Sequence, residues 1–203
     1  MLGYSPSSAH TIREEFRGIL IFVAVVWMVF IADALIPLFN LNKIGLTPRS
    51  LTGLTGIATM PFLHKGWGHL ISNSVPLVVL LTLLAGSRAR TSQIVTSIIV
   101  LSGGLLWIFG RDGIHIGASC LVFGLITFLV VSGLLEKRLV PLLISILVGV
   151  MYGWTFVKGI LPFEKGVSWD GHLLGGVAGA LVAFVMAKWL LEEKDTDTET
   201  PAV

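Results

Sequence analysis

The sequence predicts an all-α fold, a polytopic bundle of six transmembrane helices. Of its 203 residues, 54% are hydrophobic and only 13% are charged, with a mean hydropathy of +0.89, whereas a soluble domain is about a quarter charged. The hydrophobic residues also fall in long runs rather than in short periodic stripes, which is the pattern of membrane spans. The formal net charge of +2 is small and scattered, so nucleic acid is not expected as a partner.

Six apolar runs are close to the length that crosses a bilayer as a helix. The predicted spans are residues 18–39, 69–86, 94–109, 114–135, 139–156 and 172–191. The stretch 40–68 carries Pro48, Pro61 and several glycines, so we expect short segments that lie in the membrane interface. The fifth span contains Gly149 and Gly153, a spacing that favours close helix packing in membranes.

The outer limits of the spans divide the chain into three parts. Residues 1–17 form a polar N-terminal segment, residues 18–191 form one membrane domain, and residues 192–203 form an acidic tail that we expect to be disordered.

The distribution of lysine and arginine predicts the orientation of the chain in the membrane. With both termini in the cytoplasm, the inner side holds eight of the 14 basic residues and the outer side holds six. Two basic residues in each short inner connection favour this orientation.

Polar residues occupy the first turn of three predicted spans. His69 begins the second span, Ser119 lies near the start of the fourth, and His172 begins the sixth. Even-numbered spans enter the membrane from the same face, so these residues lie at similar depth. Polar side chains inside a membrane are costly and usually mark a site. We therefore expect the three to converge on one functional site.

The residue types in this set suggest nucleophilic catalysis. A serine hydroxyl attacks poorly unless a base takes its proton, and His172 can be that base if the fourth and sixth helices pack closely. Gly175 and Gly179 give the sixth helix a smooth face for such an approach. Phe123 lies one helical turn after Ser119, where its ring can stack on the imidazole.

His69 and Asn73 also lie one helical turn apart. Both side chains can donate hydrogen bonds to the oxyanion of a tetrahedral intermediate, beside the backbone N–H of Ser119. Structural roles remain open for two of these residues, since His172 and Asn73 can also form hydrogen bonds that only hold helices together.

Three neighbouring polar residues are assigned to structural places. His64 and His115 are expected as loop residues at the membrane interface. Asp170, two residues before His172, is expected to cap the sixth helix rather than to complete a catalytic triad.

Three motifs occur in order along the chain: His64-x-x-x-x-His69-x-x-x-Asn73, Gly117-Ala118-Ser119, and His172-x-x-Gly175-x-x-x-Gly179. With them the sequence resembles the rhomboid family of intramembrane serine proteases, in its bacterial six-span form, over nearly the whole of residues 18–191.

The resemblance implies an endopeptidase that works with a serine–histidine dyad and no cofactor or metal. Ser119 would be the nucleophile, His172 the general base, and His69, Asn73 and Ser119 would line the oxyanion hole, with Gly117 in the Gly-x-Ser signature. Transmembrane proteins would be the substrates and the lipid bilayer the surroundings, in a bacterial inner membrane. The fifth helix and the following loop would form the gate for substrate and water.

Two departures from the family pattern keep a second hypothesis open. Cys120 follows the serine where the family usually has glycine, and Phe123 replaces the usual tyrosine. The Trp-Arg pair common in the first loop is not evident either. Because the Cys120 side chain could crowd the oxyanion hole, the alternative is a proteolytically inactive relative that binds membrane helices.

A third hypothesis is a haem or metal site built from histidines, because imidazole is a common metal ligand. It would use His64, His69, His115 and His172.

Overall fold

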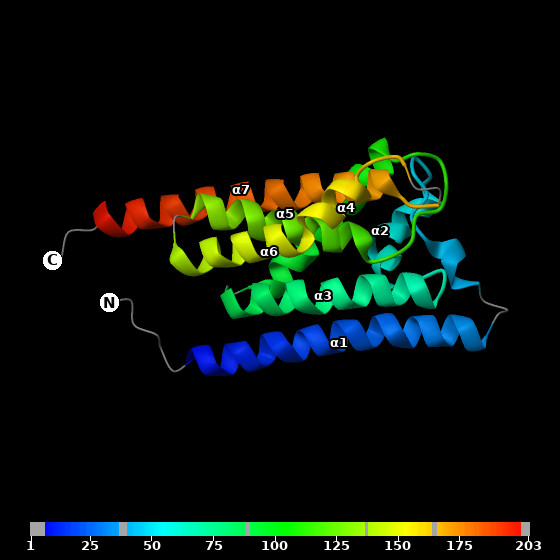
Figure 1. Cartoon of the computed structure of the whole chain (residues 1–203), viewed down its shortest axis with the longest axis horizontal. Coiled ribbons are helices and arrows are strands. Elements are labelled where there is room, and N and C mark those ends of the chain that lie inside the picture. Colours follow the sequence, from blue (N-terminus) through cyan, green and yellow to red (C-terminus); the bar gives the residue numbers. More distant parts are fainter. Residues whose placement is uncertain (1–6, 37–39, 88–89, 137, 164–165, 200–203) are drawn as a thin grey trace.

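The computed structural model describes residues 7–36, 40–87, 90–136, 138–163 and 166–199, with side chains described from residue 13 to residue 188 of these ranges. The helical elements lie as follows (Figure 1): α1 Ser7–Leu35, η1 Leu41–Ile44, η2 Thr52–Thr55, α2 Gly56–Thr59, η3 Met60–Phe62, α3 Trp67–Ser87, α4 Thr91–Phe109, α5 Ser119–Leu135, α6 Leu139–Gly159 and α7 Trp169–Glu199. Here η denotes a 3₁₀ helix.

The predicted all-α membrane fold is confirmed. Five helices in the described part of the chain are long and apolar enough to cross a membrane, namely α1, α3, α4, α6 and α7. The helix α5 is apolar but shorter, with 17 residues. The fourth predicted span, residues 114–135, is therefore a shorter helix inside the bundle.

The predicted and observed helix limits agree within five residues at the internal boundaries, and they differ more at the two ends of the chain. The helix α1 begins at Ser7, inside the predicted polar segment 1–17, and α7 continues to Glu199, inside the tail that was expected to be disordered. Residues 200–203 lie outside the described residues. Both ends differ because a polar sequence can continue a helix that the apolar part has already nucleated.

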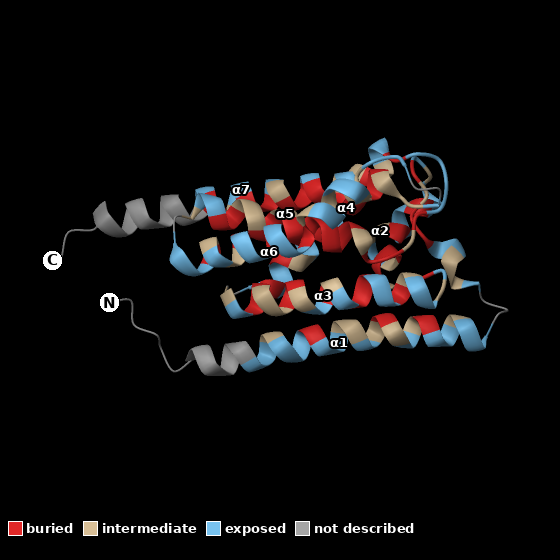
Figure 2. Cartoon of the chain, viewed as in Figure 1, coloured by how far each residue is buried: buried red, intermediate tan, exposed pale blue. Residues whose placement is uncertain are grey.

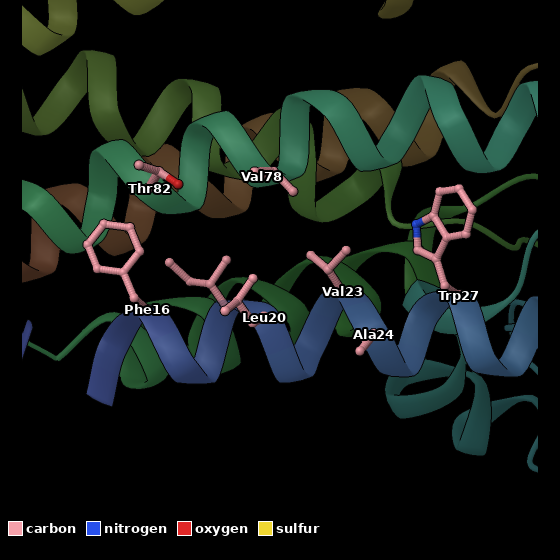
Figure 3. A pocket seen from close by; sticks show the side chains of 8 residues that line it. Phe16, Leu20, Val23, Ala24, Trp27, Val78 and Thr82 are labelled. Atoms are coloured by element: carbon pink, nitrogen blue, oxygen red, sulfur yellow. The ribbon is translucent and has the colours of Figure 1, made fainter. Parts of the chain in front are cut away.

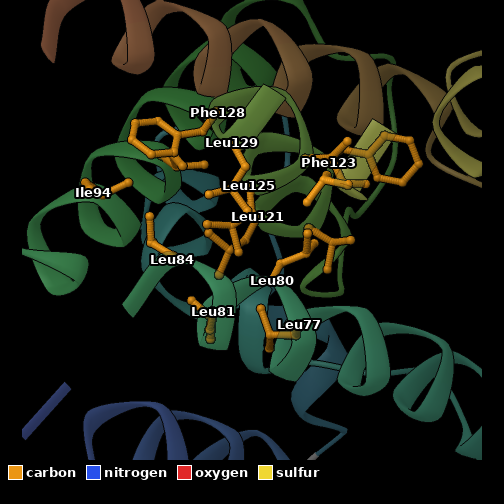
Figure 4. Packing of buried hydrophobic residues seen from close by; sticks show 14 of the residues in the cluster. Leu77, Leu80, Leu81, Leu84, Ile94, Leu121, Phe123, Leu125, Phe128 and Leu129 are labelled. Atoms are coloured by element: carbon orange, nitrogen blue, oxygen red, sulfur yellow. The ribbon is translucent and has the colours of Figure 1, made fainter. Parts of the chain in front are cut away.

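The helix α5 lies at the centre of the bundle and is buried on nearly all sides (Figure 2). Eleven of its 17 residues are buried. Figure 4 shows its leucine and phenylalanine side chains packed against side chains from α3 and α4; the labelled set is Leu77, Leu80, Leu81, Leu84, Ile94, Leu121, Phe123, Leu125, Phe128 and Leu129. A helix that is apolar all round is expected to be buried in this way.

The helices α5 and α7 approach closely through glycines. A Cβ atom at Gly175 would collide with the backbone of Cys120, and one at Gly179 would collide with the carbonyl oxygen of Gly124. Across this contact, the hydroxyl of Thr127 donates a hydrogen bond to the carbonyl oxygen of Gly176 at 2.7 Å. Helices in lipid have no hydrophobic drive to associate, so small residues and interhelical hydrogen bonds hold them together.

The close packing expected at Gly149 and Gly153 is not found. A Cβ atom added to either glycine of α6 would meet no other atom within 4 Å. The spacing indicates a smooth helix surface, but the tertiary fold turns this surface away from the other described helices.

The helix α1 packs along α3 at the edge of the bundle (Figure 1). Val26 and Phe30 of α1 enclose Leu70 of α3, and the indole N–H of Trp27 donates to the hydroxyl of Ser74 at 3.1 Å. Further toward the start of α1, an apolar groove of about 360 Å³ remains between the two helices. Figure 3 shows its lining, with Phe16, Leu20, Val23, Ala24 and Trp27 on α1 and Val78 and Thr82 on α3.

The segment between α1 and α3 folds into the short helices η1, η2, α2 and η3, as expected for this stretch. One backbone pairing ties it to the chain that precedes α5. The N–H of Leu46 donates to the carbonyl oxygen of His115 at 3.0 Å, and the N–H of His115 donates back to Leu46 at 2.8 Å. This pairing fixes the position of the backbone just before α5 begins.

We predict that Gly179→Ala destabilises the protein by about 2–3 kcal/mol, because the new methyl group would strike a backbone carbonyl that cannot move aside. The matched control is Gly149→Ala, where the space is open and the change should stabilise the helix by about 0.5–1 kcal/mol. Thermal unfolding in detergent measures both. Equal melting temperatures for the two variants would contradict the packing described for α5 and α7.

Candidate active site

One cavity opens at the end of the bundle where α3, α5 and α7 begin. Its volume is about 1080 Å³, and residues from the segment 40–66, α3, α5, α6 and α7 line it. The predicted site residues His69, Asn73, Ser119, Phe123 and His172 all lie on its wall. Gly117, Gly175 and Gly179 are not among its lining residues, and they contribute instead to the packing around it.

Ser119 is the first residue of α5, and the turn before it requires glycine. Gly117 has φ +113°, a backbone conformation that favours glycine. A Cβ atom there would also lie 2.6 Å from Cε1 and Nε2 of His69. The N–H of Gly117 donates to the carbonyl oxygen of Met60 at 2.9 Å. The turn is therefore pinned between the His69 ring and the segment 40–66.

The start of α5 directs free backbone N–H groups toward the end of the bundle where the cavity lies. The first intrahelical hydrogen bond of α5 runs from Val122 to the carbonyl oxygen of Ala118 at 3.0 Å. The N–H of Ser119 consequently has no acceptor within the helix. The positive end of the helix dipole adds to this N–H, so negative charge that develops beside Ser119 is stabilised.

The His172 ring is held on its edge and on its face. Its Nδ1 lies 2.9 Å from the carbonyl oxygen of Gly159. A carbonyl oxygen only accepts, so Nδ1 carries the proton and Nε2 keeps its lone pair. Phe123 stacks on the ring with 4.1 Å between centroids and 10° between planes. The stacking expected for Phe123 is thus present, and the Gly159 carbonyl and the Phe123 ring together orient the imidazole.

Gly159 was not found by sequence reasoning. A Cβ atom at this position would strike the ring of Phe123 and lie 3.1 Å from Nδ1 of His172. Glycine is therefore needed at the end of α6 for both rings to fit. No motif marks Gly159, because its role comes from a backbone carbonyl that only the fold brings to His172.

His69 and Asn73 present hydrogen-bond donors on α3. The side-chain N–H₂ of Asn73 donates to the carbonyl oxygen of His69 at 2.8 Å and retains a second N–H. The backbone N–H of Lys65 points at Nδ1 of His69 at 3.5 Å, so the ring proton lies on Nε2, the atom next to Gly117. Two donors on neighbouring turns can therefore serve one oxyanion.

The crowding considered for Cys120 is not found. Its side chain is buried in a cluster with Leu46, Met60 and Leu106, and Leu174 packs against this cluster. Cys120 is not among the lining residues of the cavity. The side chain points away from the space in front of Ser119 because successive residues of a helix face different directions.

The end of the cavity that faces the connecting segments carries positive charge. Lys43, Lys65 and Lys158 line it, and no carboxylate does so among the residues that the structure describes. The nearby carboxylate of Asp33 is already engaged, since it accepts hydrogen bonds from the backbone N–H of Leu41 at 2.6 Å and the side-chain N–H₂ of Asn42 at 3.2 Å.

One expectation about neighbouring polar residues was wrong. His64 and His115 lie in connecting segments, as expected, and both are buried, with 2% and 8% of their surface exposed. Asp170 does not cap α7. The hydroxyl of Ser168 accepts from the N–H of Gly171 at 3.3 Å and forms the cap, whereas Asp170 binds Arg111. Local spacing could not distinguish Ser168 from Asp170 as the cap.

The metal hypothesis finds no support in the described residues. No group of three or more His, Cys, Asp or Glu side chains in this part of the chain is arranged to hold an ion. The ring nitrogens of His115 are occupied by Ser168 and by the carbonyl oxygen of Arg111, at 2.7 and 2.9 Å.

Comparison with known proteins gives one family match and several relatives. Residues 52–189 match the family model described as the Rhomboid domain. The chain is 37% identical over 179 residues to uncharacterized proteins of Mycobacterium bovis and Mycobacterium tuberculosis, which covers 83% of this chain and 74% of theirs. An uncharacterized protein of Mycobacterium leprae is 32% identical over 200 residues, which covers 92% of this chain and 78% of the relative.

His64 is buried directly behind His69. Their ring centroids lie 5.0 Å apart, and neither ring nitrogen of His64 has a hydrogen-bond partner among the described residues. The pKa of His64 is lowered from 6.5 to about 4, chiefly by burial and also by the positive charge of a protonated His69, while the Phe62 backbone opposes the shift. The His64 ring is therefore neutral in the folded protein near pH 7.

We predict that His64 makes the protein less stable as the pH falls from 6.5 to 4. In this range the unfolded chain binds a proton at His64 and the folded chain does not, so protonation favours unfolding. A shift from 6.5 to about 4 corresponds to a loss of about 3 kcal/mol. Unfolding of the wild type and of His64→Leu across this pH range measures it, and the variant should show a smaller dependence. The same slope in both proteins would contradict the assignment.

Proposed function

Because the chain belongs to the rhomboid family, we propose that it is an intramembrane serine endopeptidase that cleaves transmembrane proteins. Ser119 is the proposed nucleophile and His172 the proposed general base. The observation that carries this assignment is the orientation of His172. Its Nδ1 is committed to the Gly159 carbonyl, Phe123 covers one ring face, and the ring lines the same cavity as Ser119.

In the proposed reaction, Nε2 of His172 takes the hydroxyl proton as the Ser119 oxygen attacks the substrate carbonyl. The resulting imidazolium keeps its Nδ1–H on the carbonyl oxygen of Gly159, whose dipole favours the positive charge. His172 then gives its proton to the leaving amine, and the acyl group remains on Ser119. A water molecule, deprotonated by the same nitrogen, releases the acyl group and restores the serine.

Three donors would hold the oxyanion of the tetrahedral intermediate. They are the backbone N–H of Ser119, Nε2–H of His69 and the second side-chain N–H of Asn73. Losing one such donor typically costs about 10²–10³ in rate. The Asn73 side chain is anchored to the backbone carbonyl oxygen of His69, which fixes the position of its second N–H.

The shape of the cavity supports a membrane helix as the substrate. From the polar loop end it extends along α3, α5 and α6 to the apolar side chains of Val122 and Ile126, past Pro76 and Tyr152. A substrate segment lying between α3 and α6 would reach Ser119 from the bilayer, while water would enter at the polar end. In this proposal α6 and the loop that follows it form the gate.

The proposed setting is a bacterial inner membrane with both termini in the cytoplasm. The start of α1 and the end of α7 lie at the same end of the bundle (Figure 1), as an even number of membrane crossings requires. The cavity then opens on the outer side, where the basic pairs of the short connections are absent.

We predict that a fluorophosphonate probe labels the purified wild-type protein, and that Ser119→Ala and His172→Ala abolish labelling. Without the serine there is no nucleophile, and without the imidazole no base activates it. In-gel fluorescence measures labelling, and cleavage of a reconstituted transmembrane reporter measures turnover. Folded wild-type protein that remains unlabelled would refute the proposal and favour the inactive, helix-binding alternative.

Replacing Cys120 separates the two hypotheses. Since the Cys120 side chain packs away from the cavity, we predict that Cys120→Gly leaves the labelling rate within about threefold of wild type, a change below about 0.7 kcal/mol in activation free energy. It should lower thermal stability instead, because it removes a buried side chain and adds backbone freedom in the first turn of α5. A large gain in labelling or cleavage would show that the thiol blocks the wild-type site.

A further inference from the structure

A buried polar cluster joins the two segments that carry Ser119 and His172. Asp170, in the first turn of α7, is only 5% exposed. One of its carboxylate oxygens accepts from the backbone N–H of Arg111 at 2.8 Å. The other accepts from the Arg111 guanidinium and from the hydroxyl of Ser168, both at 3.1 Å. The carboxylate thus binds the chain that leads to Ser119 through both backbone and side chain.

His115 lies in the same connection between α4 and α5, and its ring binds the backbone of Arg111 and the side chain of Ser168. Its Nε2 donates to the carbonyl oxygen of Arg111 at 2.9 Å, and its Nδ1 lies 2.7 Å from the hydroxyl of Ser168. The Ser168 proton is shared between His115 and Asp170, because a hydroxyl has only one proton to donate. The backbone of His115 is paired with Leu46. Three segments therefore meet at one point: the first loop, the entry to α5 and the start of α7.

The guanidinium of Arg111 closes the outer side of the cluster. Its carbon lies 5.0 Å from the centroid of the Trp169 ring, and one nitrogen donates to the carbonyl oxygen of Val167 at 3.3 Å. Arg111 and Asp170 do not line the cavity. A role in contacting substrate is therefore not expected for either residue.

The cluster lies close along the chain to both proposed reacting residues, Ser119 and His172. His115 lies four residues before Ser119, and Asp170 lies two residues before His172. The nearest glycine contact between α5 and α7, Gly175 against the Cys120 backbone, lies just after Ser119 and one turn after His172. The cluster holds the chain on the other side of both residues. A buried carboxylate bound by an arginine and a backbone N–H is a strong, directional tie at that end.

We propose that Asp170 is a positioning residue that holds Ser119 and His172 in register, through Arg111, Ser168 and His115. This inference rests on the proposed function. A displacement of about 1 Å between reacting groups can cost about 10²-fold in rate. A carboxylate that does not itself line the cavity can therefore control the reaction without touching the substrate.

The test compares Asp170→Asn with Asp112→Asn. Asp112 lies in the same connection and also pairs with an arginine, Arg49, but its side chain is 96% exposed and the pair does not reach α7. We expect Asp170→Asn to lower the rate constant of fluorophosphonate labelling about 10- to 100-fold, and to lower kcat on a transmembrane reporter with KM within about twofold. Asp112→Asn should label within about twofold of wild type.

Conservative and partial changes separate positioning from loss of folding. Asp170→Glu restores the charge and should recover part of the labelling rate. If Asp170→Asn does not accumulate as a folded protein, Ser168→Ala removes the shared hydroxyl, which also caps α7. This variant should slow labelling and lower the melting temperature by only a few degrees. Folded Asp170→Asn, or Ser168→Ala in its place, that labels at the wild-type rate would overturn the inference.

A second readout keeps this test apart from the proposed function. If wild-type protein is not labelled, the proposed protease activity fails, but hydrogen exchange still reports on the cluster. Asp170→Asn should then speed amide exchange in both residues 111–119 and residues 169–175, whereas Asp112→Asn should leave residues 169–175 unchanged. Wild-type exchange in both stretches of Asp170→Asn would refute the cluster as a tie.

Discussion

The close approach of α5 and α7 is the contact on which the rest of the structure depends. At Gly124, Gly175 and Gly179 the two backbones lie so near that no side chain fits between them. The hydroxyl of Thr127 adds a hydrogen bond across the contact. In lipid, where apolar surface gains little by leaving one apolar environment for another, this contact of small residues supplies the stability and the geometry together. Ser119 and His172 lie one to two turns from it on facing helices.

The second constraint is the use of backbone groups to orient the candidate site. A carbonyl oxygen at Gly159 fixes the ring of His172, and the N–H groups at the start of α5 would face the oxyanion of the proposed reaction. Burying a carboxylate beside a histidine in the membrane would carry a large desolvation cost. Backbone dipoles provide orientation without that cost, provided that the chain can come close, and this explains the glycines at positions 117 and 159.

The charged residues at the end of the bundle where the cavity opens are arranged differently. Asp170 and Arg111 are kept beside the site rather than in it, where the carboxylate has its hydrogen bonds satisfied by protein donors. Lys43, Lys65 and Lys158 surround the cavity opening. The result is a neutral polar interior with a charged border. The apolar faces of α1 and α6, which are exposed in the isolated chain (Figure 2), are suited to contact with lipid.

Composition and the length of the apolar runs determined the fold class, the positions of the internal helices and the three entry turns that carry His69, Ser119 and His172. These features depend on short-range properties, namely hydropathy, helix length and the polar residues that interrupt apolar runs. The motifs also identified Phe123 as a stacking partner, since a spacing of four residues places two side chains on one helical face.

Only the tertiary structure decided which glycines carry close contacts and which polar groups meet. Gly149 and Gly153 have the spacing for close packing but face open space, whereas Gly159, which no motif marks, holds the His172 ring. The direction of Cys120 and the meeting of Asp170 with Arg111 depend on how helices far apart in the sequence are rotated about their axes. That rotation is set by the sum of many packing contacts, and no local pattern of residues records it.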